Sequence, residues 1–313
     1  MQAKIKPDWA GDELLSRLVN QLIKTKPVYA LMKQQARQVL IKTAEKKGIP
    51  WRQTCTEFER SGIKDELATN PNVAYPDYYQ VPFHAYDQGN LCWQAAFEAE
   101  SATYAMALRI WPDETLTYPA AQARLRNSFH QVLAAYGLSP VSDILDLGCS
   151  VGLSTRSLQR YYSQLQPGHP VRTVGLDLSP YMLAVAKVRD PQGKIEWRHA
   201  LAEATGLRDR SFDLITLQFV IHELPRSATR SVLQEAWRLL RPGGGLAILD
   251  NNPQSAVMQN LPPVLFTLMK STEPWSDDYY TFDVAAAIAA AGFAPPVTVA
   301  SDPRHRTIVA LKP

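Results

Sequence analysis

The feature that most constrains this chain is a glycine-bearing turn, residues 148–152, which joins an apolar run to a helical run. The preceding residues 144–147 predict a strand, and residues 153–165 predict a helix. A strand, a glycine turn and a helix form the first half of a βαβ unit over a parallel sheet. Glycines let a ligand approach the backbone, and the helix N-terminus offers free N–H groups. The turn therefore predicts a site for a nucleotide or nucleoside.

The chain beyond residue 141 repeats this alternation of β-rich and helical runs, which is typical of an α/β fold. Ser179 and Pro180 supply a capping hydroxyl and a first-position proline for the helix at 179–188. Residues 241–244, Arg-Pro-Gly-Gly, predict the end of the helix at 228–240. We expect a Rossmann-like, doubly wound, mostly parallel seven-stranded sheet with an antiparallel C-terminal hairpin. The remaining expected elements are strands at 171–176, 194–198, 212–219, 245–249, 297–300 and 307–311, and a helix at 282–291.

The first 140 residues follow a different pattern. Amphipathic helices are expected over 14–23, 28–47 and 120–135, and the stretch 70–93 is dense in aromatic residues and prolines. The simplest organisation has two parts. Residues 1–140 would form a helical N-terminal region with an aromatic-rich lid segment at about 70–95, and residues 141–313 would form the α/β domain.

Composition limits which partners and which cellular compartment are expected. A net charge of +3 over 313 residues gives no general case for nucleic acid. Three cysteines without a CxxC pair argue against a disulfide framework or a cysteine-rich zinc site, and fit a reducing compartment. The sequence has neither a signal-peptide core nor a run of about 18 apolar residues. We therefore expect a cytoplasmic protein.

Two acidic residues favour one class of cofactor. Asp146 leads the turn, where a carboxylate would repel a pyrophosphate but suits a cofactor with a cationic amino group and a sulfonium. Asp177 ends the second expected strand, where an open α/β sheet places a carboxylate against a ribose diol. Together they favour a nucleoside cofactor that carries no phosphate.

With these residues the chain resembles the class I S-adenosylmethionine-dependent methyltransferase family, in particular the group that modifies small molecules. The resemblance covers residues 143–250 well and 281–313 loosely, and it implies an enzyme whose cofactor is S-adenosylmethionine. Ser150 replaces a usual third glycine, and Leu201 replaces an Asp that many relatives use to bind adenine. The cofactor-binding residues that the resemblance implies are Asp146, Gly148, Cys149, Ser150 and Gly152 in the turn, Asp177, Leu178 and Met182 after the second strand, Ala202 and Glu203 before the fourth strand, and Gln218 at its end.

The methyl acceptor is expected beyond the C-terminal ends of the fourth and fifth strands. His222 leaves the fourth strand there and is the best candidate for a catalytic base, because the ordinary pKa of histidine is near neutrality. The alternative is that His222 only caps or packs the loop, and we expect Glu223 to be a surface or capping residue. His84, His199 and His222 are free to gather near such a site, but their spacing gives no metal signature.

Two segments could cover the acceptor: residues 75–93, and the apolar insertion that follows the fifth strand. Both suit a small hydrophobic or aromatic acceptor, methylated at O, N or C, and a quinone or another prenylated ring fits this description. The alternative for the first segment is an irregular stretch that joins the helical region to the sheet. The candidate lid residues are His84, Tyr86, Asn90 and Trp93 in the first segment and Phe266, Met269 and Trp275 in the second.

The basic N-terminal helices could make weak contact with an anionic membrane surface, or could simply be solvated. Two other functions are open. One is a protein methyltransferase that recognises its partner through these helices. The other is a relative that binds the cofactor without catalysis, which Ser150 and Leu201 motivate. The basic residues are Lys24, Lys26, Lys33, Arg37, Lys42, Lys46 and Lys47.

Overall fold

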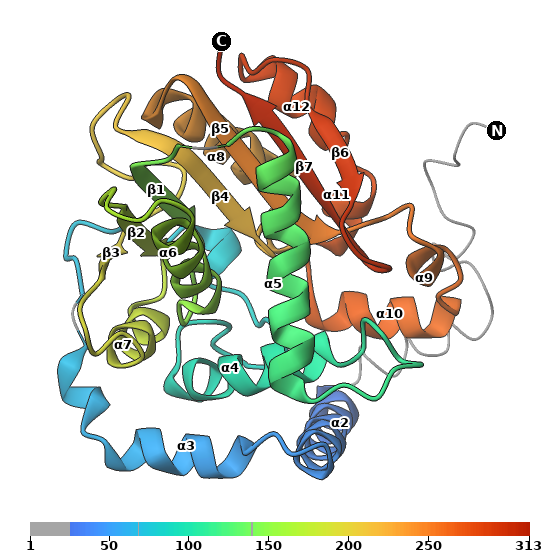
Figure 1. Cartoon of the computed structure of the whole chain (residues 1–313). Helices are drawn as coiled ribbons and strands as arrows, with labels where there is room; N and C mark the ends of the chain where they lie inside the picture. The colour runs from blue at the N-terminus through green and yellow to red at the C-terminus, as the bar shows by residue number, and fades with distance from the viewer. Residues whose placement is uncertain (1–25, 68, 139) are drawn as a thin grey trace.

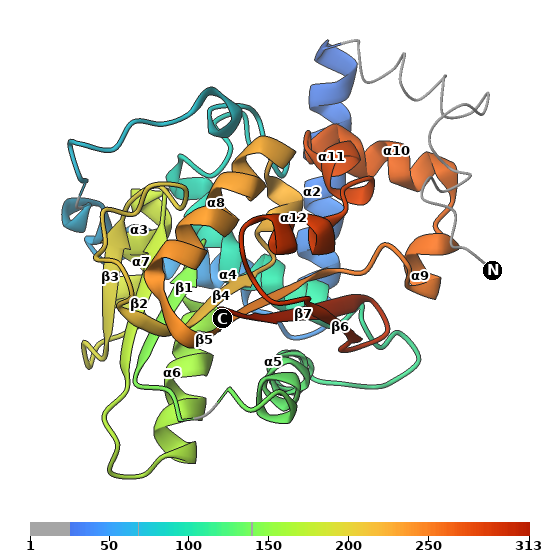
Figure 2. The same ribbon diagram turned by 90° about the horizontal axis from the view of Figure 1, so that it is seen from above.

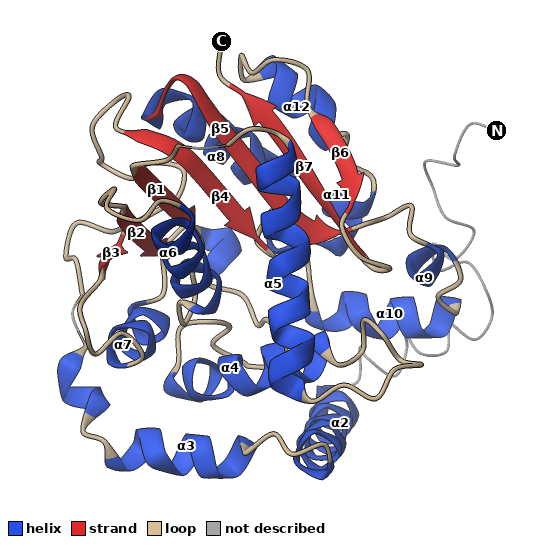
Figure 3. Cartoon of the chain, viewed as in Figure 1, coloured by secondary structure: helices blue, strands red, loops and turns tan. Residues whose placement is uncertain are grey.

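The computed structural model describes residues 26–67, 69–138 and 140–313 (Figure 1). The helix expected over 14–23 lies outside these residues. The described chain is built around one sheet with helices on both faces (Figure 2; Figure 3). No helix among the described residues is both long and apolar enough to cross a bilayer.

The sheet has seven strands in the order β3-β2-β1-β4-β5-β7-β6. Strands β1 to β5 run parallel, whereas β7 pairs antiparallel with both β5 and β6. The predicted doubly wound sheet with an antiparallel C-terminal hairpin is therefore confirmed. The strands are β1 (Asp143–Leu147), β2 (Arg172–Asp177), β3 (Ile195–His199), β4 (Phe212–Gln218), β5 (Leu240–Asn251), β6 (Val297–Ala300) and β7 (His305–Leu311).

The order of the strands places the site. Because β1 lies between β2 and β4, the chain changes its winding direction at β1, and open α/β sheets bind ligands outside the carboxyl ends of the strands at such a point. The arrowheads of β4 and β5 point to the end of the molecule where α4 (Trp93–Ala107) and α10 (Pro263–Thr272) lie (Figure 1). The glycine turn after β1 and the carboxylate that ends β2 both lie at this edge.

Apolar side chains pack against both faces of the sheet. On one face, Leu233 of α8 and Ile288 of α12 share a core with Leu217 of β4. On the opposite face, Phe129 of α5 and Leu158 of α6 pack with other strand residues, and Figure 2 shows the two helix layers on either side of the strands. The helices around the sheet are α5 (Tyr118–Ala135), α6 (Leu153–Leu165), α7 (Pro180–Val188), α8 (Arg226–Leu239) and α12 (Val284–Ala290).

Two buried glutamates of α4 join the N-terminal helices to the rest of the chain. Glu98 accepts hydrogen bonds from the guanidinium of Arg37, so this residue of the expected basic surface is in an internal ion pair. Glu100 accepts hydrogen bonds from Arg156 of α6 at 3.3 Å and from Arg189, which follows α7, at 2.5 Å. The other N-terminal helices are α2 (Lys26–Lys46), α3 (Trp51–Arg60) and the 3-10 helices η1 (Ile63–Glu66) and η2 (Asp77–Tyr79).

Some expected boundaries were wrong. Strand β5 begins at Leu240, five residues early, because Leu240 pairs with Phe212 and the Gly243 N–H donates to the Lys312 carbonyl. Helix α12 is shorter than expected and begins after Asp283, whose side chain caps it. Helices α3 and α4 were not expected at all. The insertion after β5 forms α9 (Ala256–Gln259), α10 and α11 (Ser276–Tyr280).

Candidate functional site

Asp146 holds the glycine turn in place. Its side chain is buried and accepts hydrogen bonds from the hydroxyls of Ser154, Thr155 and Thr216 at 2.6–2.8 Å. Burial raises the pKa of the carboxyl, and the three hydroxyls act against this shift. Asp146 therefore connects the turn to α6 and β4, a structural role that its position in the sequence did not reveal.

The backbone of the turn is left-handed at three positions. Gly148 has a φ of 70°, and a Cβ there would lie 2.6 Å from a methyl group of Val220. Ser150, where a glycine is usual, also takes a positive φ of 49° and so bears strain that glycine would avoid. The third position is Gly152, which is the N-cap of α6. Cys149 is buried, and burial raises the pKa of its thiol, which disfavours the thiolate that a nucleophile needs.

Asp177 connects the turn to the next helix. Its two carboxylate oxygens accept hydrogen bonds from the backbone N–H groups of Ser150 at 2.7 Å and Ser179 at 2.8 Å. Burial raises its pKa to about 6, although both amide bonds lower it. Each oxygen keeps a second lone pair, so the carboxylate can still accept hydrogen bonds from a diol. Leu178 and Met182, expected near an adenine, are buried beside it.

Residues of the aromatic segment meet the expected adenine loop. The Tyr78 hydroxyl donates to Glu203, which follows Ala202 on that loop, and the Tyr78 ring meets Trp275 edge-on. Trp275 also donates its indole N–H to the Tyr78 carbonyl at 3.3 Å. Tyr78 and Trp275, about 200 residues apart in the sequence, thus contact each other beside the loop that carries Glu203.

His199, at the end of β3, fastens the start of the aromatic segment. Its Nδ1 accepts a hydrogen bond from the Asn70 backbone N–H at 2.9 Å, so this nitrogen carries no proton. Its Nε2 then donates toward the Leu178 carbonyl at 3.0 Å and lies 3.1 Å from the Tyr75 hydroxyl. Desolvation lowers the pKa of His199, which favours this neutral form.

The residue that sequence reasoning missed on the cofactor side is Arg126 of α5. Its guanidinium is buried and donates to the Gln218 carbonyl oxygen Oε1 at 2.8 Å, and burial lowers its pKa to about 10. No carboxylate among the described residues contacts Arg126 directly, although the charge of buried Asp146 acts on it, and Gln218 Nε2 has no partner among them. A buried cation without a counter-ion is costly, so Arg126 and Gln218 together suit an anionic ligand group.

His222 lies in the 3-10 helix η3 (Ile221–Glu223), which follows β4. Its Nδ1 is 2.8 Å from the carboxylate of Asp250 on β5, so the ring is oriented with Nε2 away from the sheet. Burial alone would lower the pKa of His222, but the charge and hydrogen bond of Asp250 outweigh it and raise the pKa to about 10. A ring with this pKa is mostly protonated at neutral pH, which favours a hydrogen-bond donor over a general base, and the base role stays a prediction.

Three more side chains surround the His222 ring. Glu223 Oε1 lies 4.0 Å from His222 Nε2 and 3.8 Å from His84 Nε2, and Glu273 Oε1 lies 4.0 Å from His84 Nε2. A quarter of the Glu223 side chain is exposed, so the residue lies partly at the surface while its carboxylate faces the two imidazole rings. Burial raises the pKa of Glu223 to about 8 and raises that of Glu273. Desolvation by the surrounding chain lowers the pKa of His84.

Asn90 places this group beside the cofactor residues. Its carbonyl accepts a hydrogen bond from the Ser179 hydroxyl at 2.6 Å, two residues beyond Asp177. Its side-chain amide donates to Glu223 at 3.4 Å. Of the candidate lid residues, His84, Asn90 and Trp275 therefore lie around the site.

The other candidate lid residues pack elsewhere. The Tyr86 hydroxyl donates to Glu98, and the Trp93 ring packs on Phe97 and Tyr181 in a core between α3, α4 and α7. Phe266 is 2% exposed within the sheet core, and Met269 packs against the same core. The structure gives these four residues packing contacts and does not bring them to the His222 ring.

Comparisons with known proteins give a consistent match. A family profile described as a methyltransferase domain matches residues 145–248. An uncharacterized methyltransferase of Synechocystis sp. is 32% identical over 167 residues, which are 53% of this chain and 73% of that protein. A 2-phytyl-1,4-naphtoquinone methyltransferase of Thermosynechococcus vestitus is 36% identical over 120 residues, which are 37% of this chain and 49% of that protein.

A crystal structure has a similar fold. The CurJ carbon methyltransferase superposes with a TM-score of 0.51 at 16% identity, over 89% of this chain and 70% of that one. At this identity the likeness concerns the fold alone. It extends well beyond residues 145–248, into the N-terminal helices.

Proposed function

This chain belongs to the class I S-adenosylmethionine-dependent methyltransferases, and from that premise we propose that it methylates a small hydroxylated aromatic or quinol ring. The observation that carries the proposal is the His222–Asp250 pair, which presents an imidazole Nε2 beyond the carboxyl end of β4. One relative at 36% identity is named as a naphthoquinone methyltransferase. A ring with an ionisable hydroxyl fits a site of polar groups surrounded by aromatic side chains.

The cofactor lies along the carboxyl edge of the sheet in this proposal. The Asp177 carboxylate accepts hydrogen bonds from the ribose hydroxyls. Arg126 and Gln218 bind the carboxylate of the methionyl part, because that anion supplies the direct ion pair that the buried guanidinium lacks. Tyr78 and Glu203 cover the adenine side.

The chemistry is an in-line displacement. An oxygen or ring carbon of the acceptor donates an electron pair to the methyl carbon, the C–S bond breaks, and its electron pair stays on sulfur. The acceptor proton leaves to solvent. Positioning and exclusion of water supply most of the acceleration. His222 holds the acceptor oxygen and stabilises its negative charge, which makes either the oxygen or a neighbouring ring carbon more nucleophilic.

Substitution of His222 by alanine tests this role. We expect His222→Ala to bind S-adenosylmethionine as tightly as the parent chain in calorimetry, and to lose at least about 100-fold in kcat on hydroxylated naphthoquinol acceptors. Full activity in this variant would refute the assigned role. Transfer to proteins but to no small ring would refute the acceptor class.

A further inference from the structure

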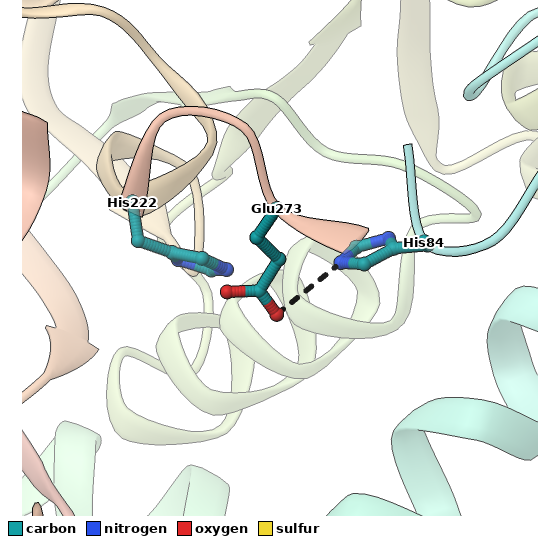
Figure 4. A group of neighbouring side chains, drawn as sticks. All are labelled: His84, His222 and Glu273. Atoms are coloured by element: carbon teal, nitrogen blue, oxygen red, sulfur yellow. Dashed lines mark ion pairs between the residues drawn. The ribbon is translucent and has the colours of Figure 1, made fainter. Parts of the chain in front are cut away.

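The second candidate site is the group of side chains around the His222 ring. We propose that His84, His222 and Glu273 bind a divalent transition-metal ion of the kind that prefers imidazole ligands, Zn²⁺ first among them. Figure 4 shows the Glu273 carboxylate between the two imidazole rings, with one nitrogen of each ring turned toward it. The spacing in the sequence gave no such signature, because the three ligands come from segments about 140 and 50 residues apart.

The three donor atoms are only slightly farther apart than the donor atoms of an occupied zinc site. One donor atom from each residue lies within 4.8 Å of the other two. Donors of a tetrahedral Zn²⁺ site are about 3.3 Å apart, since each metal–ligand bond is about 2.0–2.1 Å. Rotation of the Glu273 side chain can supply the difference. Glu223 Oε1, within 4.0 Å of both Nε2 atoms, is available as a fourth ligand or can leave that position open.

The imidazole of His222 is prepared for a metal. Its side chain is 10% exposed, its Nδ1 is bound to Asp250, and its Nε2 has no hydrogen-bond partner among the described residues. A histidine ligand commonly carries such a carboxylate on its other nitrogen, because this fixes the ring and raises its basicity. With Asp250 holding the Nδ1 proton, Nε2 points into the group, and a metal ion binds there by displacing the Nε2 proton.

A strained turn holds the His84 side chain toward Glu273. Phe83 and Tyr86 exchange two backbone hydrogen bonds, and the residues between them, His84 and Ala85, have φ angles of 49° and 70°. This geometry normally selects Asn-Gly, so the sequence keeps an imidazole at a cost in strain. The His84 N–H also donates to the Thr272 carbonyl at 2.9 Å, which fixes the turn directly beside Glu273.

The ion would take over from His222 Nε2 the contact with the acceptor oxygen, and in that respect the inference rests on the proposed function. Bound at His222 Nε2, a divalent ion is a Lewis acid that lowers the pKa of a coordinated hydroxyl and stabilises the resulting anion. The acceptor then leaves its proton to solvent before the methyl group moves. Metal binding itself can be measured without any acceptor.

The test is a titration of metal-stripped, tag-free full chain with Zn²⁺ by calorimetry. We expect one Zn²⁺ per chain, and at least about 10-fold weaker binding by His84→Asn and Glu273→Gln. Asparagine is the matched replacement at position 84 because it tolerates the left-handed backbone. His169→Asn is the control, since the His169 ring is exposed and its hydrogen-bond partner among the described residues is the Ser142 hydroxyl, and it should bind Zn²⁺ like the parent chain. Mg²⁺, which prefers oxygen ligands, should bind more weakly than Zn²⁺.

A second readout uses Co²⁺, whose visible absorption should appear in the parent chain and vanish in His84→Asn. Absence of stoichiometric Zn²⁺ binding, or equal affinity in His84→Asn and the parent chain, would overturn the proposal. Zn²⁺ bound as expected without methyl transfer to any hydroxylated ring would refute the proposed function and leave the metal site standing. Methyl transfer by a chain that binds no Zn²⁺ would do the reverse.

Discussion

At the scale of single residues, the buried guanidinium of Arg126 gives the most direct prediction about cofactor binding. The buried guanidinium is hydrogen-bonded to amide oxygens and feels the charge of Asp146 only at a distance, and the methionyl carboxylate would supply a counter-charge in direct contact. We expect Arg126→Met to weaken S-adenosylmethionine binding by about 10-fold or more while leaving thermal stability unchanged or improved. Calorimetry and thermal unfolding measure the two effects.

Arg124→Met is the matched control for this prediction. Arg124 lies on the same helix but is exposed and pairs with Glu114, so its loss should change neither quantity. A decarboxylated cofactor should bind Arg126→Met and the parent chain equally well. If it instead distinguishes them as strongly as S-adenosylmethionine does, Arg126 does not bind the carboxylate.

Ser150 makes a prediction about stability. Its left-handed backbone costs about 1 kcal/mol relative to glycine, and its hydroxyl gains only a 3.5 Å contact with the Met182 sulfur. Ser150→Gly should therefore raise the free energy of unfolding by up to about 1 kcal/mol, or the melting temperature by about 2 °C. Ser150→Ala keeps the strain and should not stabilise. Equal melting temperatures for the two variants would show that the turn is not strained.

At the scale of structural elements, the position of the aromatic segment depends on the protonation state of His199. Because desolvation lowers the pKa of His199, its neutral form stabilises the fold fully above the ordinary pKa near 6.5, and this contribution is lost as the pH falls further. Protonated Nδ1 can no longer accept the Asn70 N–H. We expect amide protection over residues 69–80 to fall between about pH 6 and pH 4, after correction for intrinsic exchange rates.

His199→Asn is the control that isolates this titration. The asparagine oxygen can occupy the place of Nδ1 and accept from Asn70 without taking up a proton. Protection in this variant should not depend on pH over the same range. A parallel loss of protection in both chains would assign the effect to another group.

The elements that the sequence predicted well are those with a local signal. The strands and the turn after β1 follow from short apolar runs and glycines, and Asp146 and Asp177 follow from their places at strand ends. Helix α4 was not expected, and the buried Glu98 and Glu100 on it pair with arginines 61 and 56 residues away, which no local pattern reveals. Arg126 and Glu273 were missed for the same reason, since their roles arise from contacts that no local pattern encodes.

For the molecule as a whole, the buried ion pairs of α4 predict that the N-terminal helices and the sheet unfold together. Glu100→Gln removes a charge that two arginines share, and we expect it to lower the free energy of unfolding by about 1–3 kcal/mol. A single thermal transition, moved as a whole to lower temperature, should be seen by calorimetry.

An exposed pair provides the comparison. Glu114→Gln breaks a contact with Arg124 at the surface and should cost less than about 1 kcal/mol. Two separate transitions in the parent chain, with only one of them moved by Glu100→Gln, would show instead that the helical region and the sheet are independent units.

The position of β7 has a consequence for synthesis of the chain. β7 lies between β5 and β6 although it comes last in the sequence, so β5 lacks its partner along residues 245–251 until residue 311 has been made. Until then a growing chain on the ribosome presents an apolar, unpaired strand edge, the kind of surface on which nascent proteins aggregate. Slow translation before β7 should therefore favour capture of this chain by chaperones.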